Sequence, residues 1–191
     1  YEHHYGYRSG LNKTMTLHLQ NLVKEIESKF KLISGDVILD IGSNDSTLLK
    51  AFSELGLKKI GIDPTGRQFE QYYPPDIKLI SDYFNLNNYK KIFPDEKAKV
   101  ITSIAMFYDL PDPVKFVEDV KEILHPEGIW VLEQSYMPTM LEKNSFDTIC
   151  HEHLEYYSLK QINWIAKNVG LRIIDASFND TNGGSIRIII S

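Results

Sequence analysis

The sequence predicts an α/β fold in which helices cover both faces of a mostly parallel β-sheet. Residues 37–63 carry the first indication, because two apolar runs that each end in an aspartate flank a helix-like segment, as in a βαβ unit. Five strand-like segments alternate with helix-like segments, which is typical of a parallel sheet. Near the end of the chain, TNGG at residues 181–184 separates two further apolar runs and predicts a hairpin that adds an antiparallel strand.

Apolar periodicity and turn residues place the individual elements. Strands are expected at residues 37–42, 59–63, 77–81, 99–106, 129–134, 172–178 and 185–190. Helices are expected at about residues 14–30, 46–55, 67–73, 113–124 and 159–169. The first helix is the longest, and it has apolar residues at helical spacing: Leu19, Leu22, Val23, Ile26 and Phe30.

The chain length and composition fit one domain of 191 residues, with an N-terminal loop and helix at 1–35 and a core at 36–191. A net charge of −5 disfavours a nucleic-acid partner bound through phosphate contacts. Cys150 is the single cysteine, so no internal disulfide forms and a cytoplasmic location is expected. No apolar run is long enough to span a membrane. Because the chain starts at Tyr1 rather than Met, we expect it to be an excerpt of a longer protein.

The turn after the first strand indicates which kind of ligand the βαβ unit suits. A dinucleotide fingerprint needs glycine at 42, 44 and 47, but Asn44 and Thr47 replace two of them, and no P-loop motif occurs. The remaining D-x-G-x-N-D-x-T pattern is acidic and favours a ligand that carries positive charge, such as S-adenosylmethionine. Asp63, at the tip of the second strand, is placed to accept hydrogen bonds from ribose hydroxyls. The alternative is an α/β protein whose first turn binds nothing.

Several motifs together resemble a known family: YGYRSG, VILDIGSND, GIDP, DLPDP, SFDTICHEHLEYYSL and TNGGSIRI. The chain resembles class I S-adenosylmethionine-dependent methyltransferases, and within them the group that includes sugar C-methyltransferases. The resemblance implies a Rossmann-like fold with a seven-stranded, mostly parallel sheet and an antiparallel terminal strand. Relatives usually carry a zinc-binding domain before this region and another domain after it, so we expect the methyltransferase core alone.

The resemblance also implies which residues contact the cofactor. Those expected at its methionine end are Asp40, Gly42, Ser43 and Asn44. Those expected at the ribose are Asp63 and Pro64, and those at the adenine are Asp82, Tyr83 and Phe84. Those expected beside the sulfonium are Ala105 and Met106, and those that would close over the cofactor are Tyr5 and Tyr7.

On the acceptor side, Glu152 and His153 match the acid–base pair of the sugar enzymes, with His153 as the proposed base. The remaining candidates for catalysis are His151, Tyr108 and Asp109. By the resemblance, Asp109 replaces a histidine of the acceptor site and Cys150 replaces a tyrosine implicated in catalysis. Ser46 stands where relatives often have glycine, a change that a helical backbone at this position would tolerate. The two acceptor-side departures make oxygen a rival to carbon as the methylated atom.

Histidine suits proton removal because its ordinary pKa of about 6.5 lies near neutral pH. An extended HEH segment would place His151 and His153 on one side and Glu152 on the other, whereas a helical one would turn a single residue toward the cleft. A neighbouring carboxylate would raise the pKa of such a histidine and orient its ring. A metal site is disfavoured because H-E-x-x-H spacing is missing, and the histidines could also be structural.

The resulting prediction is a methyltransferase that modifies carbon or oxygen, and less readily nitrogen, of a small polar metabolite. The acceptor expected from the resemblance is a sugar, a nucleotide sugar or a phosphorylated compound. The alternative from another class is a non-catalytic module that binds S-adenosylmethionine or S-adenosylhomocysteine. An NAD-dependent oxidoreductase is disfavoured by Asn44 and Thr47, and a nucleic-acid methyltransferase by the charge and the lack of a target-base motif.

Overall fold

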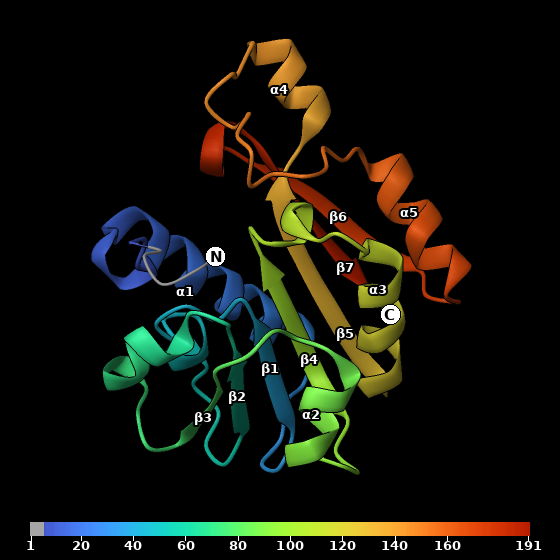
Figure 1. Ribbon diagram of the computed structural model, residues 1–191. Coiled ribbons are helices and arrows are strands. Elements are labelled where there is room, and N and C mark those ends of the chain that lie inside the picture. The colour runs from blue at the N-terminus through green and yellow to red at the C-terminus, as the bar shows by residue number, and fades with distance from the viewer. Residues whose placement is uncertain (1–5) are drawn as a thin grey trace. The chain divides into compact units, whose positions relative to one another are not determined.

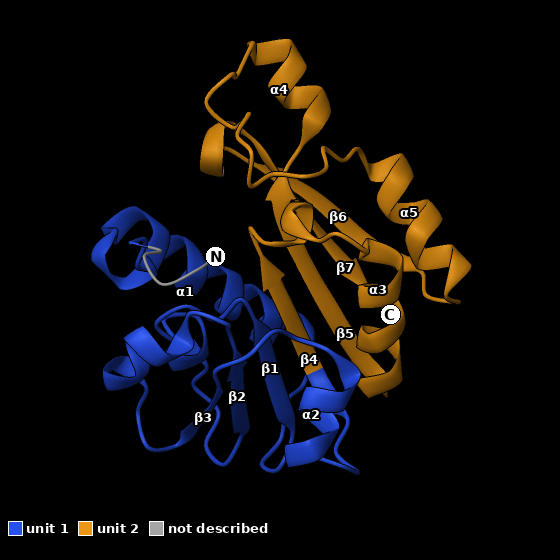
Figure 2. Cartoon of the chain, in the orientation of Figure 1, with its two compact units in different colours: residues 1–99 blue, residues 100–191 orange. Residues whose placement is uncertain are grey.

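The computed structural model describes residues 6–191, which divide into two compact units at the Lys99–Val100 boundary (Figures 1 and 2). Seven strands form one sheet in the order β3-β2-β1-β4-β5-β7-β6, and the last strand in the chain is antiparallel to both of its neighbours. The predicted α/β class and the seven-stranded sheet with an antiparallel terminal strand are therefore confirmed. The single domain expected over residues 1–191 stays a prediction.

Three parallel strands of the sheet lie in the first unit: β1 (Val37–Ile41), β2 (Lys58–Ile62) and β3 (Ile77–Ile80). All five residues of β1 are buried, as expected for a strand covered on both faces. The register pairs Ile41 with Ile62 and Ile62 with Ile80. Because the strands are parallel, their carboxyl ends meet at one edge, and this edge carries the turns predicted to bind the cofactor.

The long N-terminal helix is confirmed as α1 (Lys13–Lys29), which begins where the Asn12 side chain accepts a hydrogen bond from the Met15 amide at 3.1 Å. Its buried face consists of Leu19, Leu22, Val23 and Ile26. A seven-residue helix, α2 (Leu86–Ile92), was not expected, although Asn85 caps it in the same way. Seven residues are too few to establish an apolar period.

The helix predicted at 46–55 is wrong. Only a short 3₁₀ turn, η2 (Leu49–Ala51), forms there. The backbone expected to be helical at Ser46 is left-handed, with a φ of 61°, and the chain is already extended at Phe52, with φ of −65° and ψ of 124°. A right-handed helix cannot run through such residues. The helix predicted at 67–73 is likewise a 3₁₀ segment, η3 (Gly66–Tyr72), and η1 (Ser9–Leu11) is another near the start of the chain.

The second unit contains most of β4 (Ala98–Ile104), then β5 (Leu124–Ser135), β6 (Ile173–Asn179) and β7 (Ser185–Ile190). The predicted hairpin is confirmed, with the 3₁₀ turn η5 (Thr181–Gly183) between β6 and β7. Strand β5 begins earlier than the predicted 129–134, because the backbone is already extended from Leu124 through Pro126 and Gly128.

Helices α3 (Pro113–Ile123) and α5 (Leu159–Asn168) match their predictions, whereas the short α4 (Met137–Lys143) was missed for the same reason as α2. The aromatic core of this unit is centred on Phe107, in the 3₁₀ turn η4 (Phe107–Asp109). The Phe107 ring centroid lies 5.7 Å from Phe116, 5.8 Å from Trp130 and 5.3 Å from Tyr157. Across residues 6–191, no helix has the length and apolar character needed to cross a membrane.

Candidate active site

The first turn (residues 42–47) follows β1 and has its leading amide groups already engaged. The amide nitrogens of Gly42 and Ser43 donate to the Ile62 carbonyl at 2.8 and 3.4 Å, and the Asn44 amide donates to Asp63 Oδ2 at 2.8 Å. A phosphate site would instead need such amides to point at the ligand. The geometry therefore agrees with the acidic pattern in disfavouring a pyrophosphate here.

Asp63 is a buried carboxylate that is fixed from two sides. Besides the Asn44 amide on Oδ2, its Oδ1 accepts hydrogen bonds from the Thr65 amide at 2.7 Å and the Thr65 hydroxyl at 2.6 Å. A carboxylate oxygen can accept two hydrogen bonds, so Oδ2 retains acceptor capacity. The ribose contact expected of Asp63 stays a prediction, and Pro64 and the buried Asp40 lie at the same strand ends.

Tyr73 is a residue of this region that sequence analysis missed. Its hydroxyl lies 2.8 Å from Ser43 Oγ and donates to the Asn44 carbonyl at 2.9 Å. Burial raises the pKa of Tyr73 above its ordinary value, so the hydroxyl stays protonated. A Cβ on Gly61 would lie 2.5 Å from Ser43 Oγ and 3.0 Å from Tyr73 Cε1. Glycine is needed at 61 for Ser43 and Tyr73 to approach each other over β2.

The predicted methionine-end residue Asn44 uses its side chain in another way. Its Oδ1 accepts a hydrogen bond from the Ser9 amide at 2.9 Å, and its Nδ2 donates to the Tyr7 carbonyl at 3.0 Å. The Tyr7 side chain is partly exposed, and burial of the remainder raises its pKa. Tyr5 lies outside the described residues.

The residues expected at the adenine follow β3 in the first unit. Asp82 Oδ1 accepts a hydrogen bond from the Tyr83 amide at 2.7 Å, and the Tyr83 carbonyl accepts one from Asn88 Nδ2 at 3.0 Å. These bonds connect the turn to the first residues of α2, with Phe84 between them. The cofactor residues expected in this unit after β1, β2 and β3 thus lie at the carboxyl ends of three adjacent strands.

In the second unit, Ala105 and Met106 follow β4. Ala105 has a φ of 53°, and its amide donates to the Glu133 carbonyl of β5 at 2.7 Å. A left-handed backbone at alanine carries a strain of about 1–2 kcal/mol, so the turn after β4 is strained. The sequence contains no pattern that predicts this strain.

His153 is the best-oriented of the predicted catalytic residues. Its Nδ1 lies 2.7 Å from the Thr148 carbonyl oxygen, and its ring centroid lies 4.1 Å from that of Tyr108. Since a carbonyl oxygen can only accept, Nδ1 carries the proton, and Nε2 of the neutral ring holds the lone pair. The Tyr108 carbonyl accepts hydrogen bonds from the Leu154 and Glu155 amides at 2.9 and 3.0 Å, which fixes the chain just after His153.

The other two residues of HEH are exposed and lie in a turn that is neither extended nor helical. The side chain of His151 is 92% exposed and that of Glu152 is 52% exposed. Glu152 Oε1 lies 3.6 Å from His151 Nε2, and the group that orients the His153 ring is the Thr148 carbonyl. Asp109 lies at the end of η4, and Cys150 is a half-buried free thiol. Within residues 6–191, no three His, Cys, Asp or Glu side chains gather as metal ligands.

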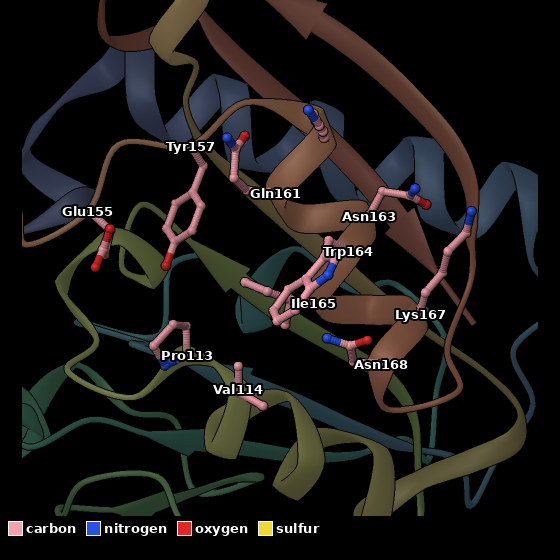
Figure 3. A pocket seen from close by; sticks show the side chains of 11 residues that line it. Pro113, Val114, Glu155, Tyr157, Gln161, Asn163, Trp164, Ile165, Lys167 and Asn168 are labelled. Carbon is pink, nitrogen blue, oxygen red and sulfur yellow. The ribbon is translucent and has the colours of Figure 1, made fainter.

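The second unit also has a mostly apolar groove of about 660 Å³ (Figure 3). It lies between the first turn of α3, with Pro113 and Val114, and the side of α5 that carries Trp164. Glu155 and Tyr157 line it from the segment that follows His153. The Tyr157 hydroxyl is buried and has no hydrogen-bond partner among the described residues.

Comparison with known proteins shows one family. A family profile described as "Methyltransferase domain" matches residues 11–176. C-methyltransferase NovU from Streptomyces niveus is 28% identical over 184 residues, which cover 96% of this chain and 44% of NovU. A ubiquinone biosynthesis O-methyltransferase from Actinobacillus pleuropneumoniae serotype 7 is 26% identical over 122 residues, which cover 59% of this chain and 52% of that protein. The chain thus spans about half the length of these curated relatives.

A solved structure is similar in fold. Magnesium protoporphyrin IX methyltransferase from Synechocystis PCC 6803, determined with bound S-adenosylhomocysteine, superposes with a TM-score of 0.66. The sequence identity is 11%, and the superposition covers 94% of this chain and 87% of that one. At this identity the similarity is one of fold.

Proposed function

This chain belongs to the methyltransferase domain family, and from that premise we propose that it methylates a small polar metabolite with His153 as general base. The methyl donor is S-adenosylmethionine, as in the class I methyltransferases that the sequence resembles. The acceptor is a sugar, a nucleotide sugar or a phosphorylated compound. The methylated atom is carbon or oxygen.

The orientation of His153 is the observation that carries this proposal. A general base must present a lone pair, and the Nδ1 contact to the Thr148 carbonyl leaves Nε2 to do so. The carbonyl and the Tyr108 ring together hold the imidazole in place, and within residues 6–191 no carboxylate contacts it. A merely solvated histidine, such as His151, has no such support.

The first unit supports the choice of methyl donor. The engaged amides of the first turn and the carboxylates of Asp40 and Asp63 suit a ligand with positive charge better than one with a pyrophosphate. The related structure with S-adenosylhomocysteine supports the same assignment. The donor would supply an electrophilic methyl group.

The reaction that fits these residues is an in-line displacement. A bond forms between the acceptor atom and the methyl carbon while the bond from that carbon to sulfur breaks, and S-adenosylhomocysteine leaves. The proton of the acceptor hydroxyl, or of a carbon next to a carbonyl, passes to His153 Nε2. The names of the relatives, a C-methyltransferase and an O-methyltransferase, are compatible with either acceptor atom.

Calorimetric titration with S-adenosylmethionine, S-adenosylhomocysteine and NAD tests the first part of the proposal. Binding of the first two and not of NAD is expected. Transfer of labelled methyl groups to nucleotide sugars, sugar phosphates and phenols then identifies the acceptor. Binding of the methyl donor without transfer to any acceptor would instead favour a non-catalytic binding module.

A further inference from the structure

We propose that Asn44 and Asp45 are positioning residues that hold an N-terminal strap (residues 7–10) against the first turn, and that this contact strengthens binding of the methyl donor. The inference rests on the proposed function, because it concerns affinity for S-adenosylmethionine. It assigns a task to the YGYRSG motif and gives Asn44 a role different from the direct cofactor contact expected from the sequence.

Asn44 connects the strap to the carboxyl ends of the strands. Its side-chain Oδ1 accepts a hydrogen bond from the Ser9 amide at 2.9 Å, and its Nδ2 donates one to the Tyr7 carbonyl at 3.0 Å. At the same time, the Asn44 backbone amide donates to Asp63 Oδ2 at 2.8 Å, and its carbonyl accepts a hydrogen bond from the Tyr73 hydroxyl at 2.9 Å. With a φ of 47°, the position favours asparagine over most residues. A shift of the strap is therefore transmitted to the backbone of the first turn.

Asp45 is the charged anchor of the strap. Its side chain is only 3% exposed, its Oδ2 accepts a hydrogen bond from the Gly10 amide at 3.0 Å, and the same oxygen lies 3.6 Å from Arg8 Nε. Its Oδ1 accepts hydrogen bonds from the Thr47 amide and hydroxyl at 3.3 and 2.5 Å. Burial of an unpaired carboxylate costs free energy. The Gly10 amide and the Arg8 guanidinium of the strap reduce this cost, because they place a hydrogen-bond donor and a positive charge beside Asp45.

Two further features fit the strap to this anchor. The Arg8 guanidinium lies 4.1 Å from the centroid of the Tyr72 ring, so it is held between an aromatic face and a carboxylate. A Cβ on Gly10 would lie 2.5 Å from Asp45 Oδ2, so only glycine permits the backbone to approach this closely. The strap is therefore matched to the turn in charge, in aromatic stacking and in size.

The functional consequence follows from preorganisation. If the strap and the turn were loose, ligand binding would have to order both, and this loss of conformational entropy would weaken affinity. With the strap fixed beforehand, the ligand meets an ordered turn. The competing interpretation is that the strap only completes the folded structure and has no effect on the ligand.

Trypsin provides a direct readout, because cleavage after Arg8 requires release of both the Arg8 side chain and the Ser9 amide. In the structure the Arg8 side chain is 20% exposed and the Ser9 amide donates to Asn44. We expect Asp45→Asn and Asn44→Asp to speed this cleavage about tenfold, measured by mass spectrometry against cleavage after Lys97 in the same digest. Asp36→Asn is the matched control, because Asp36 Oδ2 accepts a local bond from the Ile33 amide at 2.9 Å and, within residues 6–191, has no contact with the strap.

Calorimetry with S-adenosylhomocysteine then separates a positioning role from a structural one. We expect Asp45→Asn and Asn44→Asp to bind about tenfold more weakly, Asp36→Asn to bind like the wild type, and all to keep the wild-type melting temperature within a few degrees. Arg8→Lys keeps the charge and should retain more affinity than Arg8→Gln.

The outcomes are distinguishable. Unchanged cleavage after Arg8 in Asp45→Asn and Asn44→Asp would overturn the strap contact. Faster cleavage with unchanged affinity would overturn the positioning role. A wild-type chain that binds no S-adenosylhomocysteine would overturn the proposed function, and the positioning role with it, while the cleavage rates would still decide whether the strap is held by Asn44 and Asp45.

Discussion

The first turn and the HEH segment represent two different ways to build a site. Residues 42–47 are buried almost throughout and are bonded to β2, to Tyr73 and to the strap. In HEH, two of the three side chains are largely exposed, and the third is oriented by the Thr148 carbonyl and the Tyr108 ring. The proposed donor side is therefore held by many contacts, whereas the proposed acceptor side depends on the imidazole ring of His153.

The largest effect of a substitution on methyl transfer is expected at the imidazole ring of His153. His153→Ala removes the proposed base and should lower the rate of methyl transfer by about 10²–10⁴-fold, because a general base contributes acceleration of this order. The affinity for S-adenosylhomocysteine should not change. The rate is measured with labelled S-adenosylmethionine and an acceptor identified by the screen.

His151→Ala is the matched control, since His151 is two residues away and its side chain is 92% exposed. It should transfer methyl groups at the wild-type rate. If His153→Ala were equally active, or if both variants were equally impaired, the acceptor side would not depend on a single oriented histidine and the contrast with the first turn would be lost.

A smaller effect is expected at Asp63, which holds the turn rather than performing chemistry. Asp63→Asn leaves the Asn44 amide or the Thr65 groups without a charged acceptor, and such hydrogen bonds contribute about 1.5–3 kcal/mol. We expect affinity for S-adenosylhomocysteine to fall about 10- to 100-fold by calorimetry. Asp76→Asn, at an exposed carboxylate paired with Lys59, should leave the affinity unchanged. Equal affinity in both variants would remove Asp63 from the site.

The strands and long helices could be predicted because their signals are local. Helix α1 shows its apolar period over 17 residues, and the βαβ spacing places Gly42 and Asp63 at adjacent strand ends. The 46–55 segment failed because its apolar residues fit a helical period, while the hydrogen bonds of Asp45 and the left-handed φ of Ser46 impose turns. Local propensity does not reveal such tertiary bonds.

The parts of the site that sequence analysis missed depend on contacts between distant residues. Tyr73 bonds to Ser43 across 30 residues and Arg8 reaches Asp45 across 37, and neither pair forms a motif. For His153 the residue type was predictable. The tautomer was not, because it is set by the backbone carbonyl of Thr148, an atom that every residue has.

Tyr73 allows a test of the donor side at the level of one atom. Tyr73→Phe removes the hydroxyl that contacts Ser43 Oγ and the Asn44 carbonyl, and we expect affinity for S-adenosylhomocysteine to fall about five- to tenfold, from a loss of about 1–1.4 kcal/mol. Because burial raises the pKa of Tyr73, the difference between wild type and variant should persist up to pH 10. Tyr72→Phe makes the same chemical change at the next residue and keeps the ring beneath Arg8, so it should bind normally. A loss of affinity of the same size in both variants would contradict a specific role for the Tyr73 hydroxyl.

The smallest effect concerns the backbone of the first turn. Ser46 has a φ of 61°, and its hydroxyl can donate to the Asp45 carbonyl at 2.6 Å or to the Tyr72 carbonyl at 3.2 Å, so it combines a strained backbone with a compensating hydrogen bond. Ser46→Ala and Ser46→Gly both lose this bond, but only glycine relieves the strain. We therefore expect Ser46→Gly to exceed Ser46→Ala in free energy of unfolding by about 1 kcal/mol in urea denaturation. Equal stability of the two variants would show that the strain of the left-handed backbone is no larger than the entropy cost of fixing a glycine. The many bonds around the turn would then be free to stabilise ligand binding rather than to offset strain.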